Sequence, residues 1–158
     1  MLTPLAKRKV NAGGGGKFAI VASRYNARYV DAMVRAAKGE LKRAGTGKIQ
    51  ILRVPGAYEI PVVAMRLART QAGSLSAIVC LGVILRGQTT HAEHIGRAVS
   101  EALMEIQLAH EVPVIHEVLL LENEEQARVR CLGKKFNRGA EAAQTALTMA
   151  KVMRGLPG

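Results

Sequence analysis

Hydrophobic and polar positions follow two different periods along this chain, one typical of strands and one of helices. Short apolar runs predict strands at residues 17–22, 49–54, 77–85 and 112–121. Apolar residues three or four positions apart predict helices at 26–44, 62–71, from 91 onward, about 123–132 and 138–154. Strands that alternate with helices indicate the α/β class. We therefore expect a three-layer α/β/α sandwich with a four-stranded parallel sheet.

The segment 82–95, GVILRGQTTHAEHI, is the most informative part of this pattern. A continuously apolar run, which indicates a central strand, ends at Arg86-Gly87, and a helix follows. α/β proteins place anion sites and catalytic groups in such loops. His91 lies there and is able to exchange protons near neutral pH. Taken alone, the segment is explained equally well by a capped surface helix with an incidental histidine.

Two polar pairs predict where helices begin. Thr90 and Glu93 have the spacing of a capping box, in which each side chain accepts a hydrogen bond from the backbone N–H of the other residue. This places His91 in the first turn of a helix. Asn123 and Gln126 similarly predict the start of the short helix near residue 123.

Composition bounds the kind of domain. The 158 residues are enough for one domain with a substantial core. Hydrophobic residues make up 49% of the sequence although Trp is absent, so aliphatic residues must fill that core. Residues 1–16 are basic and end in four glycines, which predicts a flexible tail before a single domain at 17–158.

Charge and cysteine content indicate which kinds of binding partner and which cellular compartment to expect. The formal charge of +11 favours anionic partners such as phosphorylated metabolites, nucleic acid or an acidic surface. A basic stripe with interleaved aromatic residues, usual in nucleic-acid modules, is missing. No apolar run approaches the ~20 residues that span a membrane. Cys80 and Cys131 lack zinc-site spacing and are expected to be reduced thiols, which favours a cytoplasmic location.

The predicted topology gathers the polar loops at one place. In a doubly wound sheet, the loops that follow successive strands share the carboxyl edge, where ligands bind. These loops are Ser23–Asn26, Pro55–Glu59, Arg86–His91 and the region around His116. We therefore expect two tyrosines, a glutamate, an arginine, two threonines and a histidine to lie at one edge of the sheet.

Six segments together carry a family resemblance. They are FAIVASRYN (18–26), RVPGAYEIP (53–61), LGVILRGQTTHAEHI (81–95), VPVIHEVLL (112–120), ENEEQARVR (122–130) and NRGAEAA (137–143). In this order and at this spacing, the chain resembles the lumazine synthases. The motif PGAYEIP followed by RGQTTH is the most specific part of the match, and the basic tail lies outside it.

The resemblance implies a flavodoxin-like fold and the penultimate reaction of riboflavin biosynthesis. In that reaction 5-amino-6-(D-ribitylamino)uracil and 3,4-dihydroxy-2-butanone 4-phosphate condense to 6,7-dimethyl-8-ribityllumazine, without a metal or an organic cofactor. Family subunits form pentamers with active sites between neighbours, and some members build decamers or sixty-subunit capsids. Riboflavin synthase is a further expected partner. The alternative is a catalytically weak paralogue that binds flavin or lumazine or forms a shell.

The resemblance also implies roles for individual residues. His91 matches the catalytic histidine. The positions that match the pyrimidine and ribityl site are Tyr25, Ala57, Tyr58, Glu59, Val83, Ile84, Leu85 and His116. The positions that match the phosphate-substrate site are Gln88, Thr89 and Arg130, the last contributed by an adjacent subunit. His116 stands where many members carry Phe, which adds a titratable group and predicts pH-sensitive substrate binding.

Overall fold

The computed structural model describes residues 15–158, so nearly all of the tail predicted at 1–16 lies outside the described residues. The strands are β1 (Lys17–Ser23), β2 (Ile49–Val54), β3 (Leu75–Leu85) and β4 (Val114–Leu121). The α-helices are α1 (Ala27–Arg43), α2 (Ile60–Gln71), α3 (His91–His110), α4 (Glu124–Cys131) and α5 (Arg138–Gly155). A short 3-10 helix, η1 (Ala57–Glu59), precedes α2.

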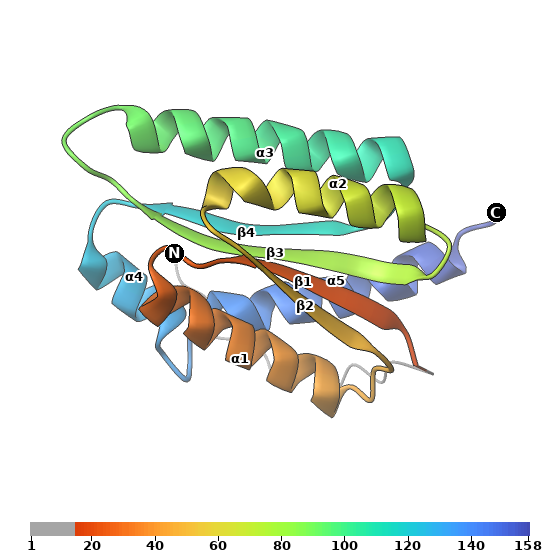
Figure 1. Cartoon of the computed structure of the whole chain (residues 1–158). Helices are drawn as coiled ribbons and strands as arrows, with labels where there is room; N and C mark the ends of the chain where they lie inside the picture. The colour runs from red at the N-terminus through yellow and green to blue at the C-terminus, as the bar shows by residue number, and fades with distance from the viewer. Residues whose placement is uncertain (1–14) are drawn as a thin grey trace.

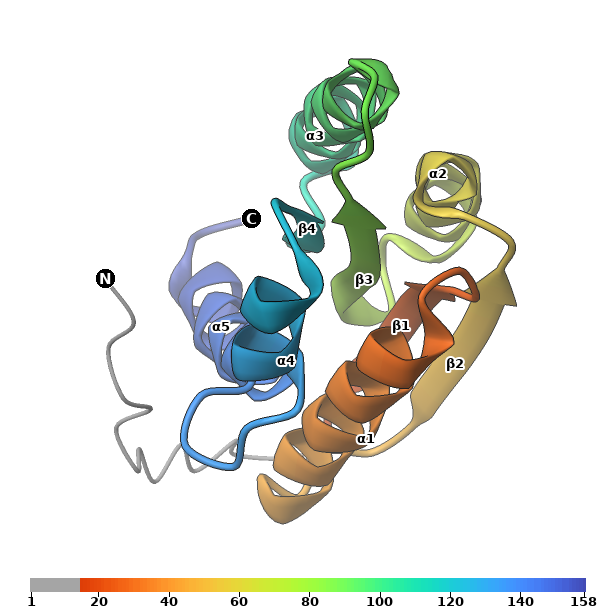
Figure 2. The same cartoon turned by 90° about the vertical axis from the view of Figure 1, so that its left-hand side faces the viewer.

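The four strands form one parallel sheet in the order β2-β1-β3-β4. Helices α2 and α3 cover one face, and α1, α4 and α5 cover the other (Figure 1). Figure 2, a view along the sheet, separates the three layers. The predicted three-layer, flavodoxin-like α/β sandwich is therefore confirmed. The chain reverses its winding direction between β1 and β3, the place where such sheets bind ligands.

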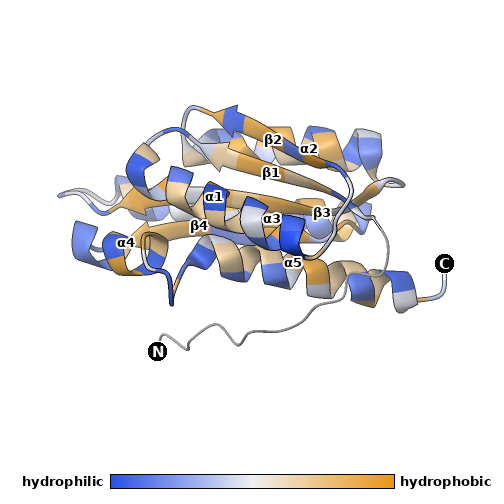
Figure 3. Cartoon of the chain, turned by 90° about the horizontal axis from the view of Figure 1, so that it is seen from below, coloured by the Kyte–Doolittle hydropathy of each residue, from blue (hydrophilic) through white to orange (hydrophobic). Residues whose placement is uncertain are grey.

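Two hydrophobic cores lie on the two faces of the sheet. Alternate residues of β1 point to opposite faces, so Phe18 and Ile20 join the core beneath α1 and α5, while Ala19 and Val21 join the core beneath α2 and α3. Seen from below, the strands are largely hydrophobic and the helices mix both kinds of residue (Figure 3). The predicted aliphatic composition of the core is confirmed, with Phe18 and Tyr29 as its aromatic members.

Helices α1 and α5 pack in close contact because of one glycine. A Cβ atom at Gly139 would lie 2.1 Å from the carbonyl oxygen of Met33, closer than any real contact. The buried face of α5 continues with small residues, among them Ala142, Ala143 and Ala146. The absence of side-chain volume at these positions lets α5 lie directly against its neighbours.

Several predicted boundaries shift by two residues. β4 begins at Val114 and not at Val112, because Pro113 has no N–H to donate to the sheet. The Pro113 carbonyl still accepts a hydrogen bond from Ile78 at 2.8 Å. β3 begins at Leu75, two residues before the predicted start, and α2 begins at Ile60, ahead of Pro61.

Candidate active site

Parallel pairing aligns the strand ends at one edge of the sheet. Ser23 is the register partner of Val54, and Leu85 is the partner of Leu121, so β1 ends level with β2 and β3 ends level with β4. This carboxyl edge faces the viewer in Figure 2. The loops that follow β1, β2 and β3 meet there, as the topology predicted. The prediction that His116 belongs to a loop at this edge is wrong, because His116 lies near the start of β4, opposite Cys80.

Tyr25 and Glu59 approach each other across Gly56. The Tyr25 N–H donates to the Pro55 carbonyl at 3.0 Å, and the Gly56 N–H donates to Glu59 Oε2 at 2.8 Å. A Cβ atom at Gly56 would lie 3.0 Å from both the Tyr25 ring and Glu59 Oε2. The missing side chain therefore lets an aromatic face and a carboxylate stand side by side at the sheet edge.

A pocket of about 540 Å³ opens between the loop after β2 and the first turns of α3. Its lining residues are Tyr58, Glu59, His91, His94, Ile95 and Ala98. Ala57 is buried behind Tyr58, whose own ring is exposed. The structure thus brings a carboxylate, a phenol and two imidazoles together around one open space.

The end of β3 extends beyond β1. The β1–β3 pairing stops at Ala22 and Leu81, whereas β3 continues to Leu85. Asn26 has a left-handed backbone, with φ of 57°, and its side-chain amide donates to the Val83 carbonyl at 2.7 Å. The backbone of Val83 to Leu85 therefore passes the loop after β1 without a paired strand on that side.

The loop 86–90 connects β3 to α3. Gln88 and Thr89 are exposed, and Thr89 Oγ1 accepts a hydrogen bond from the His91 N–H at 3.4 Å. α3 begins at His91 as predicted, but the predicted capping box is wrong because the Thr90 side chain makes no capping hydrogen bond. Glu93 instead pairs with Arg86 at 2.6 Å. A charge-assisted bond to a guanidinium is stronger than one to a neutral backbone N–H.

His116 and Arg130 lie apart from this pocket within the chain. His116 Nδ1 accepts from the Val118 N–H at 3.3 Å, so its Nε2 carries the proton shared with Ser100 Oγ at 2.7 Å. Burial lowers the pKa of His116 below its ordinary value. Arg130 is half-buried on α4. Neither side chain lines the pocket of His91.

The sequence did not reveal a buried ion pair beside these elements. Glu117 on β4 is 6% exposed and accepts a hydrogen bond from Arg138 Nε at 2.6 Å. Burial raises the pKa of the Glu117 carboxyl to about 6, against the opposing effect of Arg138. A lone glutamate within the apolar run VIHEVLLL was the available signal. Asn26 and Arg86 lie in loops that were predicted at this edge, but the sequence did not indicate their contacts with Val83 and Glu93.

Among residues 15–158, no cluster of three or more His, Cys, Asp or Glu side chains is arranged to hold a metal ion. No helix in the same range is both long and apolar enough to cross a membrane.

The fold and the pocket define an α/β protein of the doubly wound class whose candidate active site lies at the carboxyl edge of a parallel sheet. A sequence model of 6,7-dimethyl-8-ribityllumazine synthase matches residues 15–154. The chain therefore belongs to the 6,7-dimethyl-8-ribityllumazine synthase family and is a transferase of riboflavin biosynthesis.

Individual relatives agree with this assignment. The chain is 45% identical over 143 residues to the 6,7-dimethyl-8-ribityllumazine synthase of Xanthomonas oryzae pv. oryzae (strain PXO99A), covering 89% of this chain and 92% of that protein. The enzyme of the same name from Xanthomonas euvesicatoria pv. vesicatoria (strain 85-10) is 44% identical over 143 residues, with the same coverage. That of Xylella fastidiosa (strain M12) is 43% identical over 145 residues, covering 90% and 93%.

Proposed function

We propose that this transferase condenses 5-amino-6-(D-ribitylamino)uracil with 3,4-dihydroxy-2-butanone 4-phosphate at the carboxyl edge of its sheet. The observation that carries the proposal is the pocket that holds Tyr58, Glu59 and His91 together in a member of this family. The product is 6,7-dimethyl-8-ribityllumazine, released with one phosphate and two molecules of water.

The pyrimidine substrate fits the part of the pocket formed after β1 and β2. Tyr25 and Tyr58 offer exposed aromatic faces to a flat ring. One oxygen of Glu59 accepts the Gly56 N–H, which leaves the other free to accept hydrogen bonds from ribityl hydroxyls. The strand end from Val83 to Leu85 offers backbone groups to the edge of the pyrimidine.

The phosphate substrate fits the loop before α3. Gln88 and Thr89 lie just ahead of the helix N-terminus, where backbone N–H groups and the helix dipole favour an anion. His91 is the first residue of that helix and contributes to the same pocket as Glu59. A phosphate held at the loop therefore places the rest of the molecule next to the histidine.

His91 is the proposed proton carrier. The 5-amino group attacks the ketone, and loss of water gives an imine. Proton transfer then allows the phosphate group to leave, and the ribitylamino nitrogen closes the second ring with loss of another water. Holding two substrates in one orientation supplies much of the rate. His91→Ala should therefore slow turnover without abolishing it.

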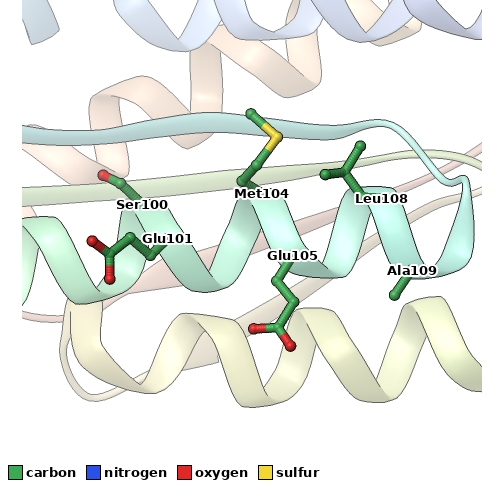
Figure 4. Close-up of a pocket in the computed structure, with 6 residues that line it drawn as sticks. All are labelled: Ser100, Glu101, Met104, Glu105, Leu108 and Ala109. Atoms are coloured by element: carbon green, nitrogen blue, oxygen red, sulfur yellow. The ribbon is translucent and has the colours of Figure 1, made fainter.

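We propose that the complete site forms between subunits of a pentamer, either alone or within a decamer or capsid. His116 and Arg130 stand away from the His91 pocket in one chain, so a neighbouring copy must bring them to it. An exposed apolar groove on α3, with Met104 and Leu108, supports such assembly (Figure 4). Met104 is 54% and Leu108 70% exposed in the isolated chain.

We expect one catalytic domain at residues 17–158, preceded in the sequence by a basic, glycine-rich segment. The free, buried thiols of Cys80 and Cys131 fit a reducing compartment such as the cytoplasm. Riboflavin synthase, which would use the lumazine product, is the expected partner enzyme.

Arg130→Ala tests whether the two substrates are bound by separate sets of residues. Loss of a bidentate phosphate contact should raise the Michaelis constant for the butanone phosphate about tenfold or more, with little change for the pyrimidine. The assay follows absorbance of the lumazine product with both purified substrates. Equal effects on both constants would refute the role of Arg130. Absence of turnover in the well-folded wild type would instead indicate a lumazine-binding or shell-forming paralogue.

A further inference from the structure

Arg86 stands at the junction of β3, α3 and β4. Its Nη1 forms an ion pair with Glu93 Oε1 at 2.6 Å, and its Nε forms one with Glu122 Oε2 at 2.9 Å. Its backbone N–H donates to the Leu121 carbonyl at 2.8 Å. A single residue therefore joins the first turn of α3 to the end of β4.

The loop 87–90 depends on these contacts for its shape. Gly87 has open space around its Cα, and Gln88, Thr89 and Thr90 are exposed. Arg86 precedes this loop, and Glu93 follows it by three residues, so their ion pair closes the loop on itself. Closing a short exposed loop lowers the entropy that substrate binding would otherwise have to remove.

The guanidinium also offsets two nearby negative charges. Glu93 and Glu122 are both partly exposed, and both contact Arg86. Without Arg86, two carboxylates would flank the loop proposed to receive a phosphate. Like charges weaken anion binding, and water between partly exposed groups screens this effect only in part.

The same contacts reach the helix that carries Arg130. The Glu122 N–H donates to Gln126 Oε1 at 3.0 Å, and the Gln126 N–H donates to Asn123 Oδ1 at 2.9 Å. These bonds define the start of α4, which continues through Arg130 to Cys131. A continuous series of hydrogen bonds and ion pairs thus runs from the loop 87–90 to the first turn of α4.

We propose that Arg86 is a positioning residue that holds the loop 87–90 ready for phosphate and orients α4 so that Arg130 meets the adjacent site. The inference rests on the proposed function, since it requires both elements to bind the phosphate substrate. In the assembly, Arg86 then links the phosphate loop of one site to the phosphate-binding arginine of the next.

Arg86→Gln tests this role in the full-length enzyme. We expect the Michaelis constant for the butanone phosphate to rise about tenfold, because a slightly misplaced loop binds and orients its substrate poorly. The constant for the pyrimidine should stay within about twofold, since its proposed contacts lie on other loops. Arg97→Gln is the matched control, because it removes an exposed ion pair to Glu101 at 2.8 Å on α3, the helix that carries Glu93. The Michaelis constants for both substrates should stay unchanged.

A second variant separates the two contacts of Arg86. Glu122→Gln weakens the link to α4 but retains the Arg86–Glu93 pair, so it should raise the same Michaelis constant by a smaller factor. It also decides the matter if Arg86→Gln does not fold, as judged by circular dichroism. The inference is wrong if the folded variants match Arg97→Gln, or if the constants for both substrates rise equally.

Thr89→Ala separates this inference from the function on which it rests. A normal constant for the butanone phosphate in both Thr89→Ala and Arg130→Ala would refute the proposed phosphate site. A raised constant in Thr89→Ala together with a normal one in Arg86→Gln would refute the role of Arg86 alone.

Discussion

Both ring nitrogens of His116 form hydrogen bonds. Its ring bridges the Val118 backbone and Ser100, whose hydroxyl donates in turn to the Gly96 carbonyl at 2.7 Å. Both ring nitrogens are occupied, which holds the ring in one orientation on β4. A phenylalanine would offer a flat surface but none of these bonds.

The pH dependence of substrate binding should reflect this environment. Burial lowers the pKa of His116, so the neutral ring is favoured, and protonation becomes important only as the pH falls below the ordinary value of 6.5. Protonation removes the acceptor for the Val118 N–H, so stability and site geometry are retained at higher pH and lost toward acid. In wild type, the Michaelis constant for the pyrimidine should rise several-fold as the pH falls below the ordinary histidine value of 6.5.

His116→Phe should flatten that profile, because no titrating group remains at the position. Steady-state kinetics between pH 5 and 8, a window of roughly the span over which histidines titrate, measures the difference. An identical profile in wild type and variant would show that His116 does not control binding.

The sequence predicted which residues meet at the candidate site better than it predicted the hydrogen bonds between them. The meeting of Tyr58, Glu59 and His91 followed from strand order alone, because parallel strands share a carboxyl edge. Local spacing predicted capping hydrogen bonds between Thr90 and Glu93, but the Glu93 carboxylate instead forms an ion pair with Arg86. The four residues of the capping-box motif do not include Arg86, so the motif alone could not predict that this arginine would compete for Glu93.

At the scale of elements, the contact between α1 and α5 is the least tolerant part of the fold. Gly139 lies against the Met33 carbonyl, and backbone atoms cannot move aside as a flexible side chain can. The Asn137 side chain, which accepts hydrogen bonds from Gly139 and Ala140 N–H groups, fixes the start of α5 at this contact.

Gly139→Ala should lower stability by about 3 kcal/mol or more, because the added methyl group forces the two helices apart. Gly39→Ala is the matched control in α1: its Cβ would meet only Arg43 Nη1 at 3.6 Å. That variant should be neutral or up to about 1 kcal/mol more stable, as Ala favours helices. Thermal and urea unfolding compare the two. Similar stability of both variants would contradict the packing argument.

The order and type of the elements were predictable, and their ends were not. Helical periodicity predicted the helix at 138–154, whose buried face includes Ala142 and Ala146, but Val152 has the same apolar spacing and is 47% exposed. The last core residue of α5 is Ala150, so the apolar spacing continues beyond the surface that the helix covers. Periodicity describes one helix, whereas burial depends on how far its neighbours extend.

At the scale of the whole molecule, the proposed site needs more than one chain. The residues assigned to the phosphate and pyrimidine are divided between the His91 pocket and the outer part of β4 and α4. The family resemblance predicts that Arg130 comes from an adjacent subunit, whereas residue spacing alone does not distinguish one copy of the chain from another. Assembly and activity should therefore be lost together.

Leu108→Lys tests this dependence by placing a charge in the α3 groove. We expect smaller species in sedimentation velocity and a loss of activity of at least about tenfold, because a desolvated lysine opposes association. Val152→Lys, which changes another exposed apolar residue, on α5, should leave assembly and activity unaltered. Intact assembly in Leu108→Lys would show that the groove lies outside the interface.

The distribution of tyrosines gives the molecule an intrinsic optical signal. The sequence contains three tyrosines and no Trp, so tyrosine dominates its ultraviolet emission. Tyr25 and Tyr58 stand exposed at the proposed pyrimidine site, whereas Tyr29 is buried in the core beside α5. A heterocycle that stacks on the first two would quench their emission and leave that of Tyr29 as background. The unmodified enzyme can therefore report when its pocket is occupied, without an added dye.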